Sequence, residues 1–281
     1  MSVTGPGTAF VTDARDAKWA HVKRKLQANT ALASARDYNG CTALHGAGWH
    51  GHVATAKRLL AAGAEVDAQM NNGSSPLHLT AAHGHTSLIV KLVQAGAEVN
   101  RKMNNGSTAL HEAAMNNHST ACEKLLELKA QVDIRDQNGS TPLHFAALQG
   151  VIPMVELLIE NKAVVAAPIK DGRTAVHGAA LNGHKKMAER LVALGVPVDS
   201  KDSQGVTALH VAIAKGNIEV AKSLLKLGAN INEVNNLGCT AMHYAAIQSV
   251  IKSCQFLCDA GADMNLRNKV DFLYYFLLFF F

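Results

Sequence analysis

Residues Asn138 to Ala147 read Asn-Gly-Ser-Thr-Pro-Leu-His-Phe-Ala-Ala, and this stretch decides the fold. Its Asn-Gly pair is a turn signal, and the Thr-Pro that follows is typical of the first residues of a helix. The turn glycine recurs every 33 residues, at Gly40, Gly73, Gly106, Gly139, Gly172, Gly205 and Gly238. The histidine recurs in step, at His45, His78, His111, His144, His177, His210 and His243. Seven copies at a constant period predict one structural unit that is repeated and stacked.

A leucine recurs at the same period in the second half of each unit, at Leu59, Leu92, Leu125, Leu158, Leu191, Leu224 and Leu257. We therefore expect each unit to contain a turn, a short helix, a tight loop, a longer helix and an extended hairpin arm. Glycine ends the longer helix in most units, as at Gly63, because its backbone tolerates the left-handed conformation. Lys129 and Lys162 stand at this stop in two units, so we expect strained backbone there.

The repeat resembles the ankyrin repeat. The resemblance rests on Gly-x-Thr-Pro-Leu-His-x-Ala-Ala, a later Gly-His pair, and Leu-Leu-x-x-Gly-Ala, and it covers about residues 37–267. It implies an all-α repeat solenoid of helix-turn-helix units with β-hairpin arms. It also implies a scaffold or adaptor that binds a protein partner, either a peptide or a folded domain, in a concave groove. Because a fold alone does not identify a function, the resemblance does not identify the partner.

The period divides the chain into four parts. We expect a disordered N-terminal tail over residues 1–11, a partial capping repeat over 12–36, seven repeats over 37–267, and an aberrant hydrophobic tail over 268–281. In the capping repeat, Trp19, Val22 and Leu26 form one apolar stripe of a helix that starts at Thr12 or Asp13 and ends near Ala28.

Residues 272–281 are all Phe, Leu or Tyr. Three interpretations remain open for this stretch: the sequence has left the repeat at a frame or splice boundary, the segment covers the last repeat, or it touches a membrane or a partner. Ten residues are too few to span a bilayer, which takes about 20 in a helix, so we expect no stable membrane insertion.

Composition favours an intracellular protein without a resident cofactor. The chain has 281 residues, 48% of them hydrophobic, with a formal net charge of +5 and five cysteines. No secretory signal is evident at the N-terminus, so we expect a cytoplasmic protein, with the nucleus as an alternative because of the basic triplet at residues 23–25. The modest positive charge permits an acidic partner. Nucleic acid is not expected, because the basic residues are spread over helix exteriors. We expect a monomer.

The histidines do not predict catalysis or metal binding. Seven belong to the repeated turn, and four more, His52, His85, His118 and His184, begin the longer helices. His21, His50 and His83 remain, and they do not form a spacing typical of a metal or catalytic site. We therefore expect that the protein is not an enzyme.

The resemblance implies that the partner is bound by variable residues at the ends of the short helices and at the turn tips. At the helix ends these are Trp49, His50, His83, Met115, Asn116, Leu148, Gln149, Leu181, Asn182 and Lys215. At the tips they are Tyr38, Lys102, Arg135, Arg173 and Lys201. Among them, Trp49, Met115, Leu148 and Leu181 are large apolar groups suited to be anchors, with Arg135 and Arg173 as a polar rim.

Two alternatives concern the wider role of the chain. It is expected either to act alone or to be a recruiting or regulatory fragment of a larger protein, such as a channel, a kinase or a ubiquitin-ligase subunit. Asn100, Asn232 and Asn265 resemble asparagines that 2-oxoglutarate oxygenases hydroxylate in such repeats. The alternative for these asparagines is hydrogen bonding within the hairpin.

Overall fold

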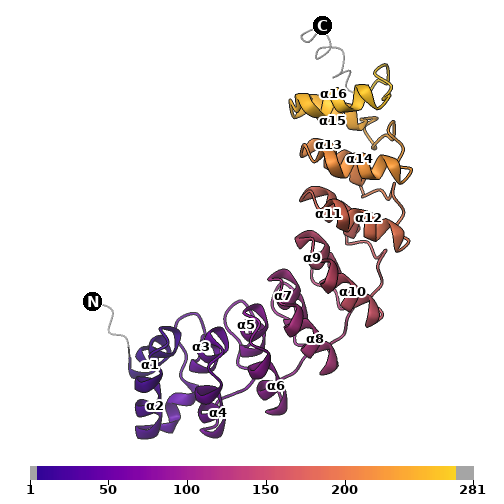
Figure 1. Ribbon diagram of the computed structural model, residues 1–281. Coiled ribbons are helices and arrows are strands. Elements are labelled where there is room, and N and C mark those ends of the chain that lie inside the picture. Colours follow the sequence, from indigo (N-terminus) through magenta and orange to yellow (C-terminus); the bar gives the residue numbers. More distant parts are fainter. Residues whose placement is uncertain (1–4, 270–281) are drawn as a thin grey trace. The chain divides into compact units, whose positions relative to one another are not determined.

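The computed structural model describes residues 5–269, which form sixteen α-helices and one short 3₁₀-helix (Figure 1). The chain consists of two compact units, the first ending at Gln137 and the second beginning at Asn138. Helices alternate between a first and a second helix in each repeat. The seven repeats therefore supply fourteen helices, and an N-terminal pair supplies the other two. We number the repeats 1 to 7 along the chain, so that repeat 1 contains the turn glycine Gly40 and repeat 7 contains Gly238.

The first unit contains α1 (Pro6–Arg15), α2 (Trp19–Ala28), the 3₁₀-helix η1 (Thr30–Ser34), α3 (Ala43–His50), α4 (Val53–Ala61), α5 (Pro76–Ala82), α6 (Thr86–Gln94), α7 (Ala109–Met115) and α8 (Ser119–Glu127). The second contains α9 (Pro142–Gln149), α10 (Ile152–Glu160), α11 (Ala175–Leu181), α12 (Lys185–Ala193), α13 (Ala208–Ala214), α14 (Ile218–Lys226), α15 (Ala241–Ile247) and α16 (Ile251–Asp259). The all-α solenoid predicted from the period is confirmed.

Within each unit the helices form two layers (Figure 1). First helices pack on first helices, as α3 does on α5 and α11 on α13, and second helices pack on second helices, as α4 does on α6 and α12 on α14. The repeated leucines of the second helices lie in the core: Leu59, Leu92 and Leu125 in the first unit, and Leu158, Leu191 and Leu224 in the second, are fully buried. Stacking similar repeats within each unit buries a core that one repeat alone could not form.

The N-terminus departs from the sequence prediction. The expected tail over residues 1–11 is wrong from Pro6 onward, because α1 starts there and packs on α3. Phe10 and Ala14 lie one helical turn apart and are fully buried in that contact. The single helix predicted from Thr12 or Asp13 is also wrong, since Ala17, with φ 57°, separates α1 from α2. A complete helix pair therefore stands where a partial capping repeat was expected.

The turns of successive repeats are joined by single backbone hydrogen bonds rather than by β-strands. No strand occurs in residues 5–269, so the β-hairpin arms are not confirmed. Instead, the amide of Asn71 donates to the carbonyl of Asn39 at 2.9 Å, and Lys170 donates to Asn138 at 2.8 Å. Among the described residues, the last bond of this series is at Lys269, whose backbone N–H donates to the carbonyl of Leu237 at 2.9 Å.

The hydrophobic tail predicted over 268–281 is therefore wrong at its first two residues, which continue the turn pattern. Asn268 is also buried, with its amide 3.4 Å from the sulfur of Cys239. The remaining residues of that prediction, 270–281, lie outside the described part of the chain.

The repeated histidine caps each first helix, and in repeat 1 it also bonds to the next turn. In all seven repeats it forms a capping box with the Thr or Ser three residues earlier. In the first repeat the backbone N–H of Thr42 donates to Nδ1 of His45 at 3.1 Å. Because that N–H can only donate, Nδ1 is unprotonated, and Nε2 carries the hydrogen that it donates to the carbonyl of Ser74 at 3.0 Å. The histidine is thus held neutral between its own helix and the next repeat.

Residues other than glycine occupy left-handed positions, and at Lys129 and Lys162 the sequence predicted the strain. Lys129 and Lys162 both have φ of 72° at the end of a second helix, and Asn117 has φ of 61° between two helices. These positions carry a conformational cost that glycine avoids in the other repeats.

Glycine is required between the first and second helices of repeat 4. A Cβ built on Gly150, whose φ is +74°, would lie 2.6 Å from Cγ of His184, whereas one on Gly216, with φ +71°, would meet only Val250 at 3.4 Å. Both alanine variants place a side chain in the left-handed region, which costs roughly 1–2 kcal/mol. Gly150→Ala is expected to cost about 1–3 kcal/mol more than Gly216→Ala, because it also displaces a ring. Urea denaturation of both variants measures the difference, and equal losses would contradict the steric argument.

Candidate partner-binding surfaces

Indole and imidazole rings gather at the loops that join the first and second helices of the first three helix pairs. We call this group the ring cluster. It consists of Trp19, Trp49, His50, His52, His83 and His85. Trp19 stacks on His52 at a centroid distance of 4.4 Å, and Trp49 lies 4.1 Å from His83. Trp49 remains half exposed. The cluster therefore presents aromatic surface to solvent from side chains that neighbouring rings hold in place.

Hydrogen bonds to carbonyls fix the orientation of these rings. Nε2 of His50 lies 2.7 Å from the carbonyl of Arg15, and Nε2 of His85 lies 3.0 Å from that of Trp49. Nδ1 of His83 lies 2.9 Å from the carbonyl of Leu79. Since a carbonyl only accepts, each of these nitrogens carries the hydrogen. Burial lowers the pKa of His52 below its usual value, which favours its neutral form.

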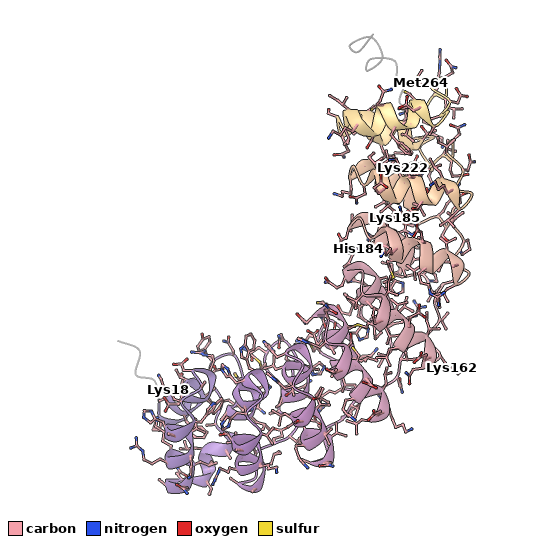
Figure 2. All side chains as sticks on the ribbon, viewed as in Figure 1. Lys18, Lys162, His184, Lys185, Lys222 and Met264 are labelled. Atoms are coloured by element: carbon pink, nitrogen blue, oxygen red, sulfur yellow. The ribbon has the colours of Figure 1, made fainter. Side chains whose placement is uncertain are left out.

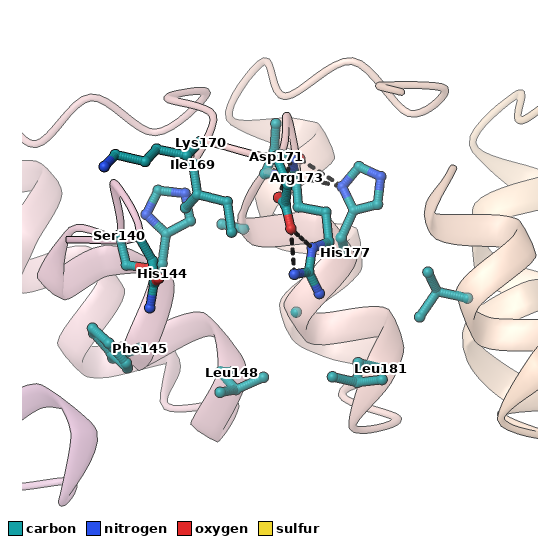
Figure 3. Close-up of a pocket in the computed structure, with 15 residues that line it drawn as sticks. Ser140, His144, Phe145, Leu148, Ile169, Lys170, Asp171, Arg173, His177 and Leu181 are labelled. Atoms are coloured by element: carbon teal, nitrogen blue, oxygen red, sulfur yellow. Dashed lines mark hydrogen bonds and ion pairs between the residues drawn. The ribbon is translucent and has the colours of Figure 1, made fainter. Parts of the chain in front are cut away.

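A pocket of about 510 Å³ lies in the second unit between the turns and the first helices, and we call it the repeat 4–5 pocket (Figure 3). Its apolar lining residues include Phe145, Leu148, Ile169, Leu181 and Val211. The polar rim comes from the turn of repeat 5, with Lys170, Asp171 and Arg173. Figure 3 shows Leu148 and Leu181 at the helix ends, on the side of the pocket opposite Lys170. An apolar floor with a few polar groups is the usual composition of a binding site.

The charged rim of this pocket is ordered by one ion pair. Nε of Arg173 donates to Oδ2 of Asp171 at 2.7 Å, and Nη2 donates to the same oxygen. The hydrogen bond from Arg173 lowers the pKa of Asp171, and that from Asp171 raises the pKa of Arg173, so both remain charged at neutral pH. Burial lowers the pKa of His177 behind them. The guanidinium is thus fixed beside the pocket.

The predicted site residues fall in both units, and the structure describes each set by itself. In the ring cluster Trp49 contacts His83 and His50 contacts Trp19, whereas Leu148, Leu181 and Arg173 line the repeat 4–5 pocket. The remaining predicted residues lie at partly or fully exposed positions elsewhere, namely Tyr38, Lys102, Met115, Asn116, Arg135, Gln149, Asn182, Lys201 and Lys215. The fold thus places six of the predicted residues in these two groups.

Several of the scattered residues have partners within the protein. Nζ of Lys102 donates to the carbonyl of Arg135 at 2.9 Å, and Nζ of Lys201 donates to that of Val234 at 3.2 Å, 33 residues on in each case. Asn182 donates to the carbonyl of Leu148 at 2.8 Å. These side chains join neighbouring repeats, a role that the sequence prediction did not assign to them.

Asparagines of the arms also join repeats. Oδ1 of Asn100 accepts from the amide of Gln131 at 2.8 Å, and Oδ1 of Asn232 accepts from Asp263 at 2.9 Å. The backbone N–H of Asn265 instead donates to Oδ1 of Asp263 at 2.8 Å, within the same arm. The side chains of Asn100 and Asn232 therefore bond to the next repeat, whereas the hydrogen-bonding interpretation had expected a bond within their own hairpin.

Gly178 is a pocket-lining residue that sequence reasoning missed. It lines the repeat 4–5 pocket at the position directly after the repeated histidine, where repeats 4 and 7 carry Phe145 and Tyr244. Gly46 occupies the same position in repeat 1, but a Cβ there would lie 2.8 Å from the backbone of Ala14, so α1 already fills that space. Aligning the repeats at this position would have singled out both glycines, and only the structure separates them.

Basic residues on the second helices are paired with acidic neighbours. Glu219 lies 2.8 Å from Nζ of Lys222 and 3.8 Å from Nζ of Lys185, and Figure 2 shows both lysines. Arg190 donates two hydrogen bonds to Glu156 across α10 and α12. The positive charge of this layer is thus partly neutralised within it.

Residues 5–269 contain no group of three or more His, Cys, Asp or Glu side chains arranged to hold a metal ion. Over the same range, none of the helices has the length and apolar character needed to cross a membrane.

Comparisons with known proteins agree with the geometry. A family model described as ankyrin repeats, in three copies, matches residues 44–136, 113–202 and 193–268. Among solved structures, the crystal structure of the human ASB11 ankyrin repeat domain is similar, with 28% sequence identity and a TM-score of 0.70. The match covers 78% of this chain and 98% of that one. A comparison with curated proteins finds no match.

Proposed function

Because this chain belongs to the ankyrin-repeat family, whose members are generally protein–protein interaction modules, we propose that it is a non-catalytic scaffold or adaptor. It binds a partner protein through the exposed side chains of its turns and first helices. The observation that carries the proposal is the repeat 4–5 pocket, in which Leu148 and Leu181 stand partly exposed beside charged groups. Such an arrangement resembles the apolar centre and polar rim of a protein interface.

The ring cluster supports a second contact area on the first unit. Tryptophan is enriched among the residues that dominate binding energy, and half-exposed Trp49 is already held against His83. An ordered indole loses little conformational entropy when a partner covers it. We assign Trp49 as the anchor of this area.

Alanine variants of the two anchors test the proposal. Trp49→Ala and Leu148→Ala are each expected to weaken capture of the partner at least about tenfold, because a buried anchor contributes roughly 2 kcal/mol or more to binding. Affinity capture from a cell extract with quantitative mass spectrometry measures the loss. Circular dichroism during heating should show little change in the melting temperature, since neither side chain belongs to the fully buried core.

Leu227→Ala is the matched control, because Leu227 is also an exposed leucine but lies at the end of the second helix α14. Its capture should equal that of the original protein. Unchanged capture in both Trp49→Ala and Leu148→Ala would defeat the proposal, and so would a loss of equal size in Leu227→Ala.

A further inference from the structure

We infer that the repeat 4–5 pocket accepts one large apolar side chain of the partner and binds an aspartate or glutamate next to it in the partner sequence. This inference rests on the proposed function and specifies the partner's chemistry. It follows from two features of the second unit: space left open by Gly178, and one edge of Arg173 left available for a carboxylate.

The apolar part of the inference comes from Gly178. The three atoms nearest to a Cβ built there all belong to Leu148, at 3.6 Å or more, which is ordinary van der Waals contact. Phe145, Leu181 and Val211 surround the same space from three successive first helices. Because Gly178 contributes no side chain, this space is open to an apolar group from outside, and filling it removes apolar surface from water.

The acidic part comes from the way Asp171 holds Arg173. Asp171 occupies the edge formed by Nε and Nη2, so the Nη1 side of the guanidinium retains donors. Two parallel N–H donors match the two oxygens of a carboxylate. Lys170 adds a second positive charge on the rim, and Figure 3 shows both residues above the pocket. A carboxylate adjacent to the anchor would therefore meet a guanidinium that is already oriented.

Charge favours a carboxylate over a phosphate. Asp171 pairs with the Nε edge of Arg173, so the rim formed by Lys170, Asp171 and Arg173 keeps a net charge of +1. One carboxylate balances that charge, whereas a phosphorylated side chain carries close to two negative charges at neutral pH. The rim thus selects an aspartate or glutamate side chain of a partner polypeptide.

The test uses the whole chain and a phage-displayed library of random peptides, with counter-selection on Gly178→Phe. Phenylalanine at this position occurs naturally in repeat 4 as Phe145, and Gly178 has no positive φ, so the variant should fold. Leu79→Phe introduces the same side chain at the equivalent position of repeat 2, which does not line the pocket, and serves as the control. The selected peptides are then synthesised with a fluorescent label for anisotropy measurements.

We expect the selected peptides to share a large apolar residue with Asp or Glu within about two positions. Affinity should fall at least about tenfold on Gly178→Phe and stay unchanged on Leu79→Phe. Replacing the peptide's Asp with Asn should weaken binding to the original protein about three- to tenfold. In Arg173→Gln that difference should disappear, because the residue that distinguishes the two peptides is gone.

Three results would overturn the inference: selected peptides without an acidic residue, an Asp-to-Asn difference that persists in Arg173→Gln, or tighter binding when phosphoserine replaces Asp. If any of these occurs while Leu148→Ala still abolishes capture, the proposed function stands and only the assigned chemistry fails. If no peptide depends on Gly178, the inference fails, and the proposed function fails with it when Trp49→Ala and Leu148→Ala both capture normally.

Discussion

Acidification from pH 7 to pH 5 is expected to destabilise the folded protein by roughly 2 kcal/mol for each of His45 and His78. Burial lowers the pKa of both histidines from 6.5 to about 4 in the folded state. Their contribution to stability is complete above the unfolded pKa of 6.5 and is lost as the pH falls towards about 4. Between these values the unfolded chain binds protons that the folded chain does not.

The hydrogen bonds explain why the charged form is excluded. A proton on Nδ1 of His45 would face the backbone N–H of Thr42, which now donates to that nitrogen at 3.1 Å. Burial also lowers the pKa of His177, His210 and His243, so further losses in the same direction are expected. Within residues 5–269, Nε2 of His243 has no hydrogen-bond partner, and its tie is therefore incomplete there.

Urea denaturation at several pH values between 7 and 5 measures this effect. His78→Gln should flatten the dependence of the unfolding free energy on pH, because one titrating group is removed. His21→Gln, which replaces an exposed histidine of α2, should leave the slope unchanged. An unfolding free energy that does not change over this range would contradict the claim that the buried histidines of the repeats are neutral in the folded protein.

Leu158→Ala is expected to lower the free energy of unfolding by roughly 2–5 kcal/mol. Leu158 lies on α10 in the core of the second unit and has no exposed surface. Alanine would lose the transfer free energy of the removed carbons and leave a cavity that the stacked helices fill only partly. The effect should be among the largest of any single substitution in this unit.

The measurement is urea denaturation followed by circular dichroism. Leu227→Ala provides the comparison and should change the unfolding free energy by less than about 1 kcal/mol, because Leu227 is 39% exposed. A similar small loss for Leu158→Ala would mean that the repeated leucines do not form the core of the unit.

The period of 33 residues was sufficient to predict the seven repeats, because every repeat satisfies the same contacts with its neighbours. The turn glycines, the capping Thr and His, and the buried leucines all follow from that constraint. The helix α1 could not be found in this way, since it begins outside the strict repeat and its Phe10 and Ala14 are explained only by contact with α3.

The candidate site was harder to predict, because it depends on side chains that differ between repeats. Leu148, Leu181 and Arg173 were identified from their positions, but Gly178 was not, since its importance lies in a side chain that is missing. Lys102 and Lys201 were predicted to contact a partner, and each donates a hydrogen bond to the carbonyl of a neighbouring turn, which the spacing did not predict. Some exposed side chains form hydrogen bonds within the protein. Their identity depends on three-dimensional contacts and cannot be derived from spacing alone.

Site-specific photocrosslinking tests the central claim most directly. A benzophenone amino acid is placed at Leu181, in the repeat 4–5 pocket, or at Leu227, on the second helix α14, and the whole chain is irradiated in a cell extract. The account predicts covalent adducts with a partner polypeptide from position 181 and none from position 227. Adducts from position 227 alone, or none from either position, would contradict it.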